Sequence, residues 1–407
     1  MAEPRDSQPP QPLPCFALAI ALSLGAAVSL GVTRFAYGLL LPPMRADLQW
    51  SYTLAGAMNT ANALGYLLGA LATPWLMARL GPARLLLIGA VLASAFMGVT
   101  GFFTGAVPLL LQRLLAGAAS AFLFIAGGLL AARVGAMQPQ RSGLLLGLYY
   151  GGTGLGIVAS ALLVPWTLDA AQARPHAWAW AWWALSLACF AATAVLAWPA
   201  RVLAAQEGAA PAQAAERAFA WRDFLPGLAG YAMFGIGYIG YMTFVIALLR
   251  EQGVGPARIT LFYALLGVAV IASSRIWAGL LDRFRGGEPL AVLNALVGLA
   301  TLLPALTAWW PLVLASGLLF GAVFLSVVAS TTALVRHNLP ASQWAAGISA
   351  FTIVFAAGQI VGPTVVGWIA DGPGGLARGL VFSAAALWVG ALLALRQRAL
   401  PQSAPIT

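Results

Sequence analysis

The chain contains no lysine, and charged residues of both signs are scarce. Only 8% of its 407 residues are charged and 61% are hydrophobic, whereas soluble proteins have roughly 25% and 45–50%. A water-soluble fold of this length could not bury so much apolar surface, so the composition predicts an integral membrane protein. All 21 basic residues are arginine, against 11 acidic ones. The net charge of +10 lies mostly between the apolar runs, which argues against nucleic acid as a partner.

Residues that perform catalysis or bind metals are equally rare. The only histidines, His176 and His337, fall in predicted loops on opposite faces of the membrane, and the two cysteines, Cys15 and Cys189, lie far apart in apolar runs. Neither pattern fits a metal site or a disulfide framework, and no serine or cysteine lies near a base that could activate it. A nucleotide-binding loop and a repeated filter motif are missing too. The sequence therefore predicts no enzyme, no metal or other cofactor, no ATP-driven pump and no channel.

Twelve apolar runs fill most of the chain. A hydrocarbon core of about 30 Å is crossed by roughly 20 residues of helix, and runs without alternating polarity satisfy their backbone groups as α-helices. The sequence therefore predicts an all-α membrane protein with twelve transmembrane helices. We expect them over residues 15–41, 52–77, 84–103, 107–131, 142–165, 178–198, 224–249, 258–281, 289–308, 311–335, 344–370 and 376–396.

The longest polar stretch divides these helices into two sets of six. The predicted organisation is a disordered tail (1–14), a six-helix bundle (15–199), a linker (200–222), a second six-helix bundle (223–398) and a short tail (399–407). Thirteen arginines lie in the tails and even-numbered loops and five in the odd-numbered loops. By the positive-inside rule, both termini and the linker are expected in the cytoplasm.

Weak internal repetition supports a duplicated six-helix unit, a known plan for transporters with a midplane site. Four short patterns recur in the same order at an offset of 204 or 206 residues. The pairs are Gly31-x-x-Arg34-x-x-Tyr37 with Gly235-x-x-Tyr238-x-x-Tyr241, Arg79 with Arg283, Leu114-Leu115-x-Gly117 with Leu318-Leu319-x-Gly321, and Gly152-x-x-x-Gly156 with Gly358-x-x-x-Gly362.

Two motifs resemble conserved motifs of the major facilitator superfamily. The loop 279–285, which contains Asp282 and Arg283, resembles the family's signature Gly-x-Leu-x-Asp-Arg-x-Gly-Arg-Arg, and the matching loop near Arg79 keeps only Arg-x-Gly. Arg113-x-x-x-Gly117 is similar to the family's fourth-helix arginine motif. The resemblance implies gating or conformational roles for Asp282, Arg283, Arg79 and Arg113.

A third motif resembles one branch of this superfamily. Arg34-Phe35-Ala36-Tyr37, just before Leu41-Pro42-Pro43-Met44, resembles the YbfB-like branch of bacterial facilitators. This resemblance implies a monomeric, multi-pass protein of the bacterial inner membrane, driven by an ion or solute gradient.

Three arginines lie inside predicted helices, where each costs about 2.5–3.5 kcal/mol near the bilayer centre. Arg113 is close to the outer end of its helix, so its side chain is expected to reach interfacial water. Arg34 and Arg275 are farther from either surface and are expected to face a water-filled cavity or a partner. The alternative for all three is a packing role, with the guanidinium bonded to backbone carbonyls.

The functional interpretation of these arginines is anion binding. No Asp or Glu lies inside any predicted helix, and guanidinium groups bind carboxylates bidentately. The resemblance adds that anion facilitators place cationic residues at similar positions. The sequence therefore predicts a secondary transporter that moves a small organic anion of the carboxylate type by alternating access. An efflux transporter for drugs or for neutral or cationic metabolites is the alternative, and a co-transported proton is left open.

Other polar residues are candidates to complete the substrate site. Asn59, Asn62 and Tyr66 share one helix face at helical spacing, and Tyr238 and Tyr241 are similarly placed in the seventh helix. Tyr149 and Gln359 lie beside the glycine patterns of the fifth and eleventh helices. Hydrogen bonds between helices are the alternative role for each of them.

Overall fold

The computed structural model describes residues 14–205, 220–340 and 343–400. Within these ranges twelve segments are long and apolar enough to cross a membrane, and no residue is in a strand. The predicted all-α fold with twelve spans is therefore confirmed. The prediction of disorder for residues 1–14, and most of the predicted linker and C-terminal tail, lie outside the described residues.

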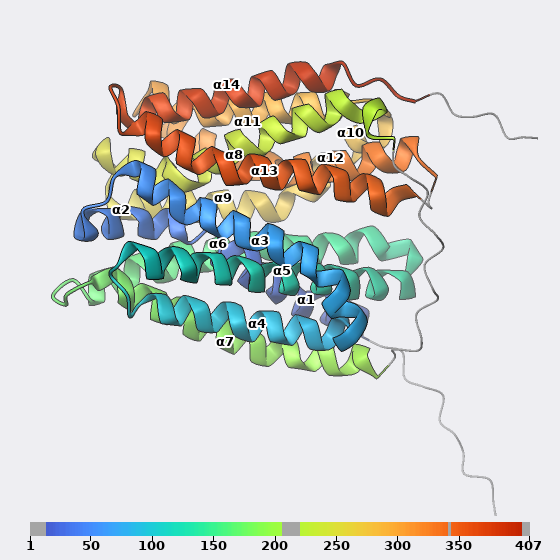
Figure 1. The fold of residues 1–407 in the computed structure, drawn as a ribbon, viewed down its shortest axis with the longest axis horizontal. Helices are drawn as coiled ribbons and strands as arrows, with labels where there is room; N and C mark the ends of the chain where they lie inside the picture. The colour runs from blue at the N-terminus through green and yellow to red at the C-terminus, as the bar shows by residue number, and fades with distance from the viewer. Residues whose placement is uncertain (1–13, 206–219, 341–342, 401–407) are drawn as a thin grey trace, which may run out of the picture.

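The spans form two bundles, which Figure 1 shows one below the other. The first bundle contains α1 (Cys15–Ala26), the π-helix η1 (Ala27–Val32), α2 (Tyr37–Leu48), α3 (Tyr52–Leu80), α4 (Pro82–Thr100), α5 (Ala106–Met137), η2 (Pro139–Arg141), α6 (Ser142–Ala170) and α7 (Ala177–Ala204). The second contains η3 (Trp221–Phe224), α8 (Leu225–Glu251), α9 (Pro256–Ile276), α10 (Ala278–Arg283), α11 (Glu288–Leu306), α12 (Trp310–Asn338), α13 (Trp344–Ala370) and α14 (Gly375–Leu395).

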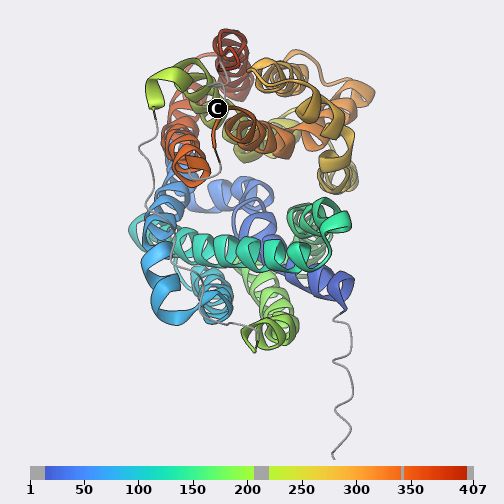
Figure 2. The same ribbon diagram turned by 90° about the vertical axis from the view of Figure 1, so that its right-hand side faces the viewer.

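The two ends of the molecule differ. We call the end that carries Cys15, Ala204 and Trp221 the terminal end, on the right of Figure 1, and the opposite end the far end. Figure 2 views the molecule from the terminal end and again shows the two bundles stacked. Within the described ranges, the side-chain hydrogen bonds between the bundles are confined to one part of the molecule. They extend from the Arg34–Gln359 contact to the far end.

The first span differs from the continuous helix predicted over 15–41. It comprises α1, η1, a turn at residues 33–36 and then α2, which continues to Leu48. Pro42 and Pro43, which predicted the end of the helix, lie inside α2. Interior prolines are tolerated in membrane helices because neighbouring groups satisfy the freed backbone. The span is therefore both longer and more irregular than the sequence indicated.

Glycine contacts repeat between the bundles. A Cβ atom at Gly117 would lie 2.1 Å from the carbonyl oxygen of Asn62, and one at Gly321 would lie 2.3 Å from that of Leu266. Both residues of the second pair follow those of the first by 204 positions, as the predicted repeat requires. The α3–α5 and α9–α12 contacts are therefore equivalent close approaches of two backbones.

The glycine match between α6 and α13 is shifted by one turn. Gly31 meets Gly156, and Gly235 meets Gly358, so Gly358 corresponds in its contacts to Gly156 and not to Gly152. The glycines in both patterns are four residues apart, which is close to one helical turn. The sequence therefore could not distinguish the two registers.

Replacing Gly65 by alanine should destabilise the first bundle. The new Cβ would lie 1.8 Å from the Leu114 carbonyl oxygen, so α3 and α5 would have to separate, at a cost of about 1–3 kcal/mol. The matched control is Gly143→Ala in α6, where a Cβ meets nothing within 4 Å. We expect a lower thermal unfolding midpoint in detergent for Gly65→Ala alone; equal midpoints for the two variants would contradict the close approach.

Candidate functional site

The irregular first span leaves backbone carbonyls for other helices to satisfy. The amide groups of Thr33 and Phe35 donate to carbonyls five residues earlier, at 3.0 and 3.1 Å. The Thr33 carbonyl accepts a bond of 2.8 Å from Nη1 of Arg113, and the Phe35 carbonyl accepts one of 2.7 Å from the Tyr263 hydroxyl. Such breaks inside membrane helices are typical of binding sites. Arg34 lies in this break.

Arg113 is a buried residue that connects α5 to the first span and to α3. Its side chain is 3% exposed, so the expectation that it reaches interfacial water is wrong: the turn at residues 33–36 and α3 supply its acceptors inside the bundle. Nη2 donates a bond of 2.9 Å to Oδ1 of Asn59, and the guanidinium lies 4.9 Å from the ring centroid of Tyr37. Two hydrogen bonds and the ring face replace part of the lost hydration, while Nε is buried without a hydrogen-bond partner among the described residues.

Asn59 extends this network into the second bundle. Its Nδ2 donates a bond of 2.7 Å to the hydroxyl of Thr243 on α8. Asn62, one turn farther along α3, donates a bond of 3.1 Å to the Arg113 carbonyl, which is the interhelical role left open by the sequence. Thr243 was not predicted, because its position among apolar residues of α8 gives no signal in the sequence.

Arg34 forms a second polar contact between the bundles. Its side chain is 4% exposed, and Nη2 donates a hydrogen bond to Oε1 of Gln359 on α13. The guanidinium also lies 5.8 Å from the ring centroid of Tyr66 and within electrostatic range of Tyr238. The structure therefore brings together Arg34, Gln359, Tyr66 and Tyr238, which the sequence had proposed from four separate helices.

The charge in this region is uncompensated. Within the described ranges, neither Arg34 nor Arg113 forms an ion pair with a carboxylate, and the two guanidinium groups are close enough to repel each other. We call Arg34, Arg113, Asn59, Gln359, Tyr66 and Tyr238 the central cluster. Two buried cations without a counterion form a site that favours an anion.

Two of the predicted tyrosines lie outside this cluster. The buried Tyr149 donates its hydroxyl proton to the Phe124 carbonyl at 2.7 Å. The hydroxyl of Tyr241 lies 2.6 Å from that of Ser316. Both phenols hold neighbouring helices together, which is the packing alternative.

The remaining predicted residues lie toward the terminal end. Arg275, in the last turn of α9, is exposed, as are Asp282, Arg283 and Arg79. The guanidinium of Arg79 lies over Trp75 and that of Arg283 over Phe284, each within its own segment. Among the residues that the structure describes, none of these four forms an ion pair with the opposite bundle. Within the described ranges, the proposed gating residues Asp282, Arg283 and Arg79 therefore do not join the two bundles in this conformation.

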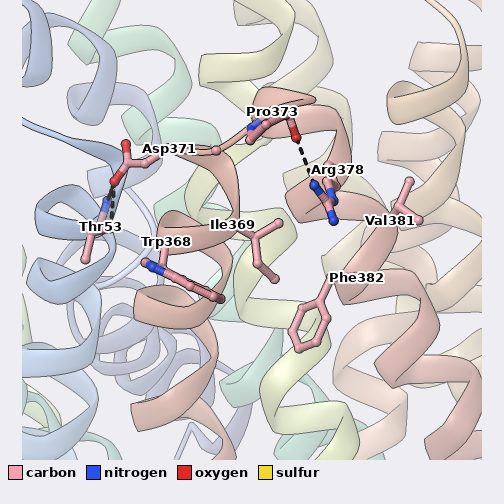
Figure 3. Close-up of a pocket in the computed structure, with 9 residues that line it drawn as sticks. Thr53, Trp368, Ile369, Asp371, Pro373, Arg378, Val381 and Phe382 are labelled. Carbon is pink, nitrogen blue, oxygen red and sulfur yellow. Dashed lines mark hydrogen bonds between the residues drawn. The ribbon is translucent and has the colours of Figure 1, made fainter.

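The far end contains a contact that the sequence did not predict. Asp371, directly after α13, accepts bonds of 2.7 and 2.8 Å from the backbone amides of Tyr52 and Thr53 and one of 2.6 Å from the Thr53 hydroxyl. Figure 3 shows this carboxylate at the start of α3. A negative charge is favourable at a helix N-terminus. We call Asp371, Tyr52 and Thr53 the far-end latch, because it joins the two bundles.

Other groups surround the latch. The Tyr52 hydroxyl donates a hydrogen bond to Glu251 at the end of α8, and the Arg45 guanidinium lies 3.7 Å from the Tyr52 ring centroid. A pocket of 590 Å³ opens beside it, lined mainly by apolar side chains of α13 and α14. In Figure 3 Arg378 lies across this pocket from Asp371 and donates to the Pro373 carbonyl at 3.2 Å.

The latch should respond to pH only under strongly acidic conditions. Burial raises the pKa of Asp371, but the hydrogen bonds from Thr53 and Tyr52 and the charge of Arg45 outweigh it and lower the pKa below its ordinary value of 3.8. The charged Asp371 carboxylate therefore stabilises the latch fully when the pH is above the ordinary pKa. This stabilisation is lost as the pH falls through the lowered pKa. The latch should therefore be insensitive to pH between about 5 and 8.

Distance measurements between spin labels at Ala46→Cys and Gly372→Cys, one on each bundle, would test this. We expect an unchanged distance over that range and a longer one only when the pH falls through the lowered pKa of Asp371. Asp371→Asn, which mimics the protonated acid, should lengthen the distance at every pH. A distance that increases on acidification from about pH 8 to pH 5 would contradict the assignment.

The histidines do not form a metal site. His176 pairs with Asp47 at 2.5 Å, and His337 lies in the last turn of α12, not in the predicted loop, because that helix continues to Asn338. Within the described ranges no three His, Cys, Asp or Glu side chains are grouped as metal ligands.

Comparisons with known proteins agree with this architecture. The family described as "Uncharacterised MFS-type transporter YbfB" matches residues 26–395. A chloramphenicol resistance protein of Streptomyces lividans is 29% identical, with 92% of this chain and 95% of that protein covered. The nucleoside transporter NupG has a similar fold, with a TM-score of 0.69 at 12% identity, covering 93% of this chain and 98% of that one. A bacterial homologue of the human lysosomal transporter Spinster gives 0.67 at 15% identity, covering 95% and 98%.

Proposed function

Since this chain belongs to the YbfB-type family of major facilitator transporters, we propose that its central cluster carries a small organic anion of the carboxylate type. The chain is a membrane transporter and not an enzyme. The proposal of an anionic substrate depends on one observation. The central cluster holds two buried arginines, and no carboxylate among the described residues neutralises them.

The physical argument is one of desolvation. A buried guanidinium costs several kcal/mol unless hydrogen bonds and an opposite charge compensate it. Arg113 has two protein acceptors, but Arg34 has only the neutral amide of Gln359. A carboxylate could accept from the remaining donors of Arg34 and supply the missing charge. Arg34 is therefore the proposed primary ligand, with Gln359, Tyr66 and Tyr238 beside it. The exposed Arg275 is proposed as a secondary cation nearer the terminal end.

The proposed mechanism is alternating access between the two bundles. The far-end latch is formed, and within the described residues Asp282, Arg283 and Arg79 form no ion pair with the opposite bundle, so this conformation would receive substrate from the terminal end. The arginine distribution supports a cytoplasmic terminal end in a bacterial inner membrane. A bound anion neutralises Arg34 and lowers the cost of closing the bundles around it. A coupling proton would travel on the substrate's own acid group.

Uptake of labelled carboxylates into proteoliposomes tests this function. We expect saturable uptake of at least one small carboxylate, competed by other carboxylates and not by their amides. Uptake of neutral or cationic compounds, with no competition by any carboxylate, would overturn the proposal.

The second candidate is efflux of a drug or neutral metabolite. The similarity to a protein named for chloramphenicol resistance favours it. Overexpression followed by growth on a drug panel separates the two functions, because an efflux transporter raises resistance and a carboxylate transporter leaves it unchanged.

A further inference from the structure

A stack of aromatic rings adjoins Arg34, and from it we propose that the transported anion is an aromatic carboxylate. The inference rests on the proposed anion transport and specifies its substrate class. The ring of the substrate would lie against Phe355 while its carboxylate binds Arg34.

The rings of Phe355, Tyr231, Phe234 and Tyr238 are nearly parallel. The Phe355 ring centroid lies 4.8 Å from that of Tyr231 and 5.5 Å from those of Phe234 and Tyr238, with interplanar angles of 17, 11 and 19°. Tyr238 in turn stacks on Phe324 at 6.1 Å and 9°. Edge-to-face contacts are at least as common as stacked ones between aromatic side chains. A set of parallel rings therefore presents flat faces, which another planar ring can extend.

The stack adjoins the polar ligands through two helices. On α13, Phe355 precedes Gln359 by four residues, so the two side chains share one helix face. Gln359 accepts the hydrogen bond from Arg34. On α8, Tyr238 belongs to the stack and lies in electrostatic range of Arg34. The cation and the rings are thus neighbours.

Phe355 in the stack and Tyr66 beside Arg34 are partly exposed. Tyr238, Phe234 and Tyr231 are buried, but Phe355 and Tyr66 are only partly buried. Tyr66 belongs to α3, in the first bundle, whereas the aromatic stack belongs to the second. The Tyr66 ring centroid lies 5.8 Å from the Arg34 guanidinium. Among the described residues, neither the Tyr66 nor the Tyr238 hydroxyl has a hydrogen-bond partner. A flat substrate between Phe355 and Tyr66 would therefore meet a ring from each bundle, a cation and two free phenols.

Transport of a matched pair of acids tests the inference. Benzoate and cyclohexanecarboxylate have the same charge and similar size, but only benzoate is planar and aromatic. Stacking predicts a KM for benzoate roughly two- to tenfold lower in the parent protein. Phe355→Leu should abolish this preference, and Phe355→Tyr, which retains the ring, should preserve it. Phe190→Leu, at a partly exposed position on α7 away from the stack, is the control for a general effect of losing a phenyl ring.

The outcomes separate this inference from the proposed function. Equal KM values for the two acids in the parent protein, or a preference that survives Phe355→Leu, would overturn the aromatic assignment and leave anion transport intact. Transport of aliphatic carboxylates without benzoate would do the same. If no carboxylate is transported, both the function and its substrate class are wrong.

Discussion

Carboxylate uptake is expected to fall about 10- to 150-fold when Arg34 is replaced by glutamine. A hydrogen bond to a charged group contributes about 1.5–3 kcal/mol, and each 1.4 kcal/mol is a factor of ten. Arg34 offers that bond from a buried position without a protein counterion, so water screens it little. Glutamine keeps a polar side chain that can still donate to Gln359 but removes the charge. Initial rates of labelled carboxylate uptake into proteoliposomes measure the effect.

Arg275→Gln is the matched comparison, because it removes the same charge from an exposed position. Exposed ion pairs contribute about 0–1 kcal/mol, so uptake should fall by less than about fivefold, mainly through KM. The thermal midpoint of Arg34→Gln should be no lower than that of the parent, because the substitution removes a buried charge without a counterion, and that of Arg275→Gln should match the parent. If the two substitutions reduce uptake equally, Arg34 is not the primary ligand; if neither does, the anion site lies elsewhere.

The membrane fold could be predicted because apolar length and arginine placement are local properties of the sequence. The arginines inside the helices could be recognised for the same reason, since a charge in an apolar run is visible without coordinates. Arg34 and Gln359 were both proposed as ligands, and the structure joins them across the two bundles.

The contacts between distant residues could not be predicted in this way. The π-helix before Arg34 has no distinctive composition, and the turn that follows it is held by distant side chains, since Arg113 and Tyr263 donate to the carbonyls of Thr33 and Phe35. Asp371 follows an apolar run, and nothing in the sequence around it indicates a partner. Its role in the far-end latch depends on the N-terminus of α3, where its partner Thr53 lies 318 positions earlier in the chain. The aromatic stack likewise forms only when α8, α12 and α13 pack together.

Replacing Arg113 by leucine should reduce both stability and uptake. The substitution leaves the Thr33 carbonyl and Oδ1 of Asn59 without donors inside the bundle, and each unsatisfied buried group costs about 1–3 kcal/mol. Thr33 directly precedes Arg34, so the released backbone would also move the proposed substrate ligand. We therefore expect a thermal midpoint lower by several degrees, together with a loss of uptake. Arg84→Leu, at an exposed position in the first turn of α4, should change neither.

A double-mutant cycle separates this positioning role from a general loss of charge. Once Arg113 is absent, Asn59→Leu removes an acceptor that is already unsatisfied, so its added cost should be much smaller than in the parent protein. Arg113→Lys keeps the charge but cannot bond both acceptors in the planar geometry of guanidinium; its stability and uptake should be intermediate. Additive midpoints for Arg113→Leu and Asn59→Leu would contradict the network. Parent-like uptake by Arg113→Leu would show that Arg34 is positioned without it.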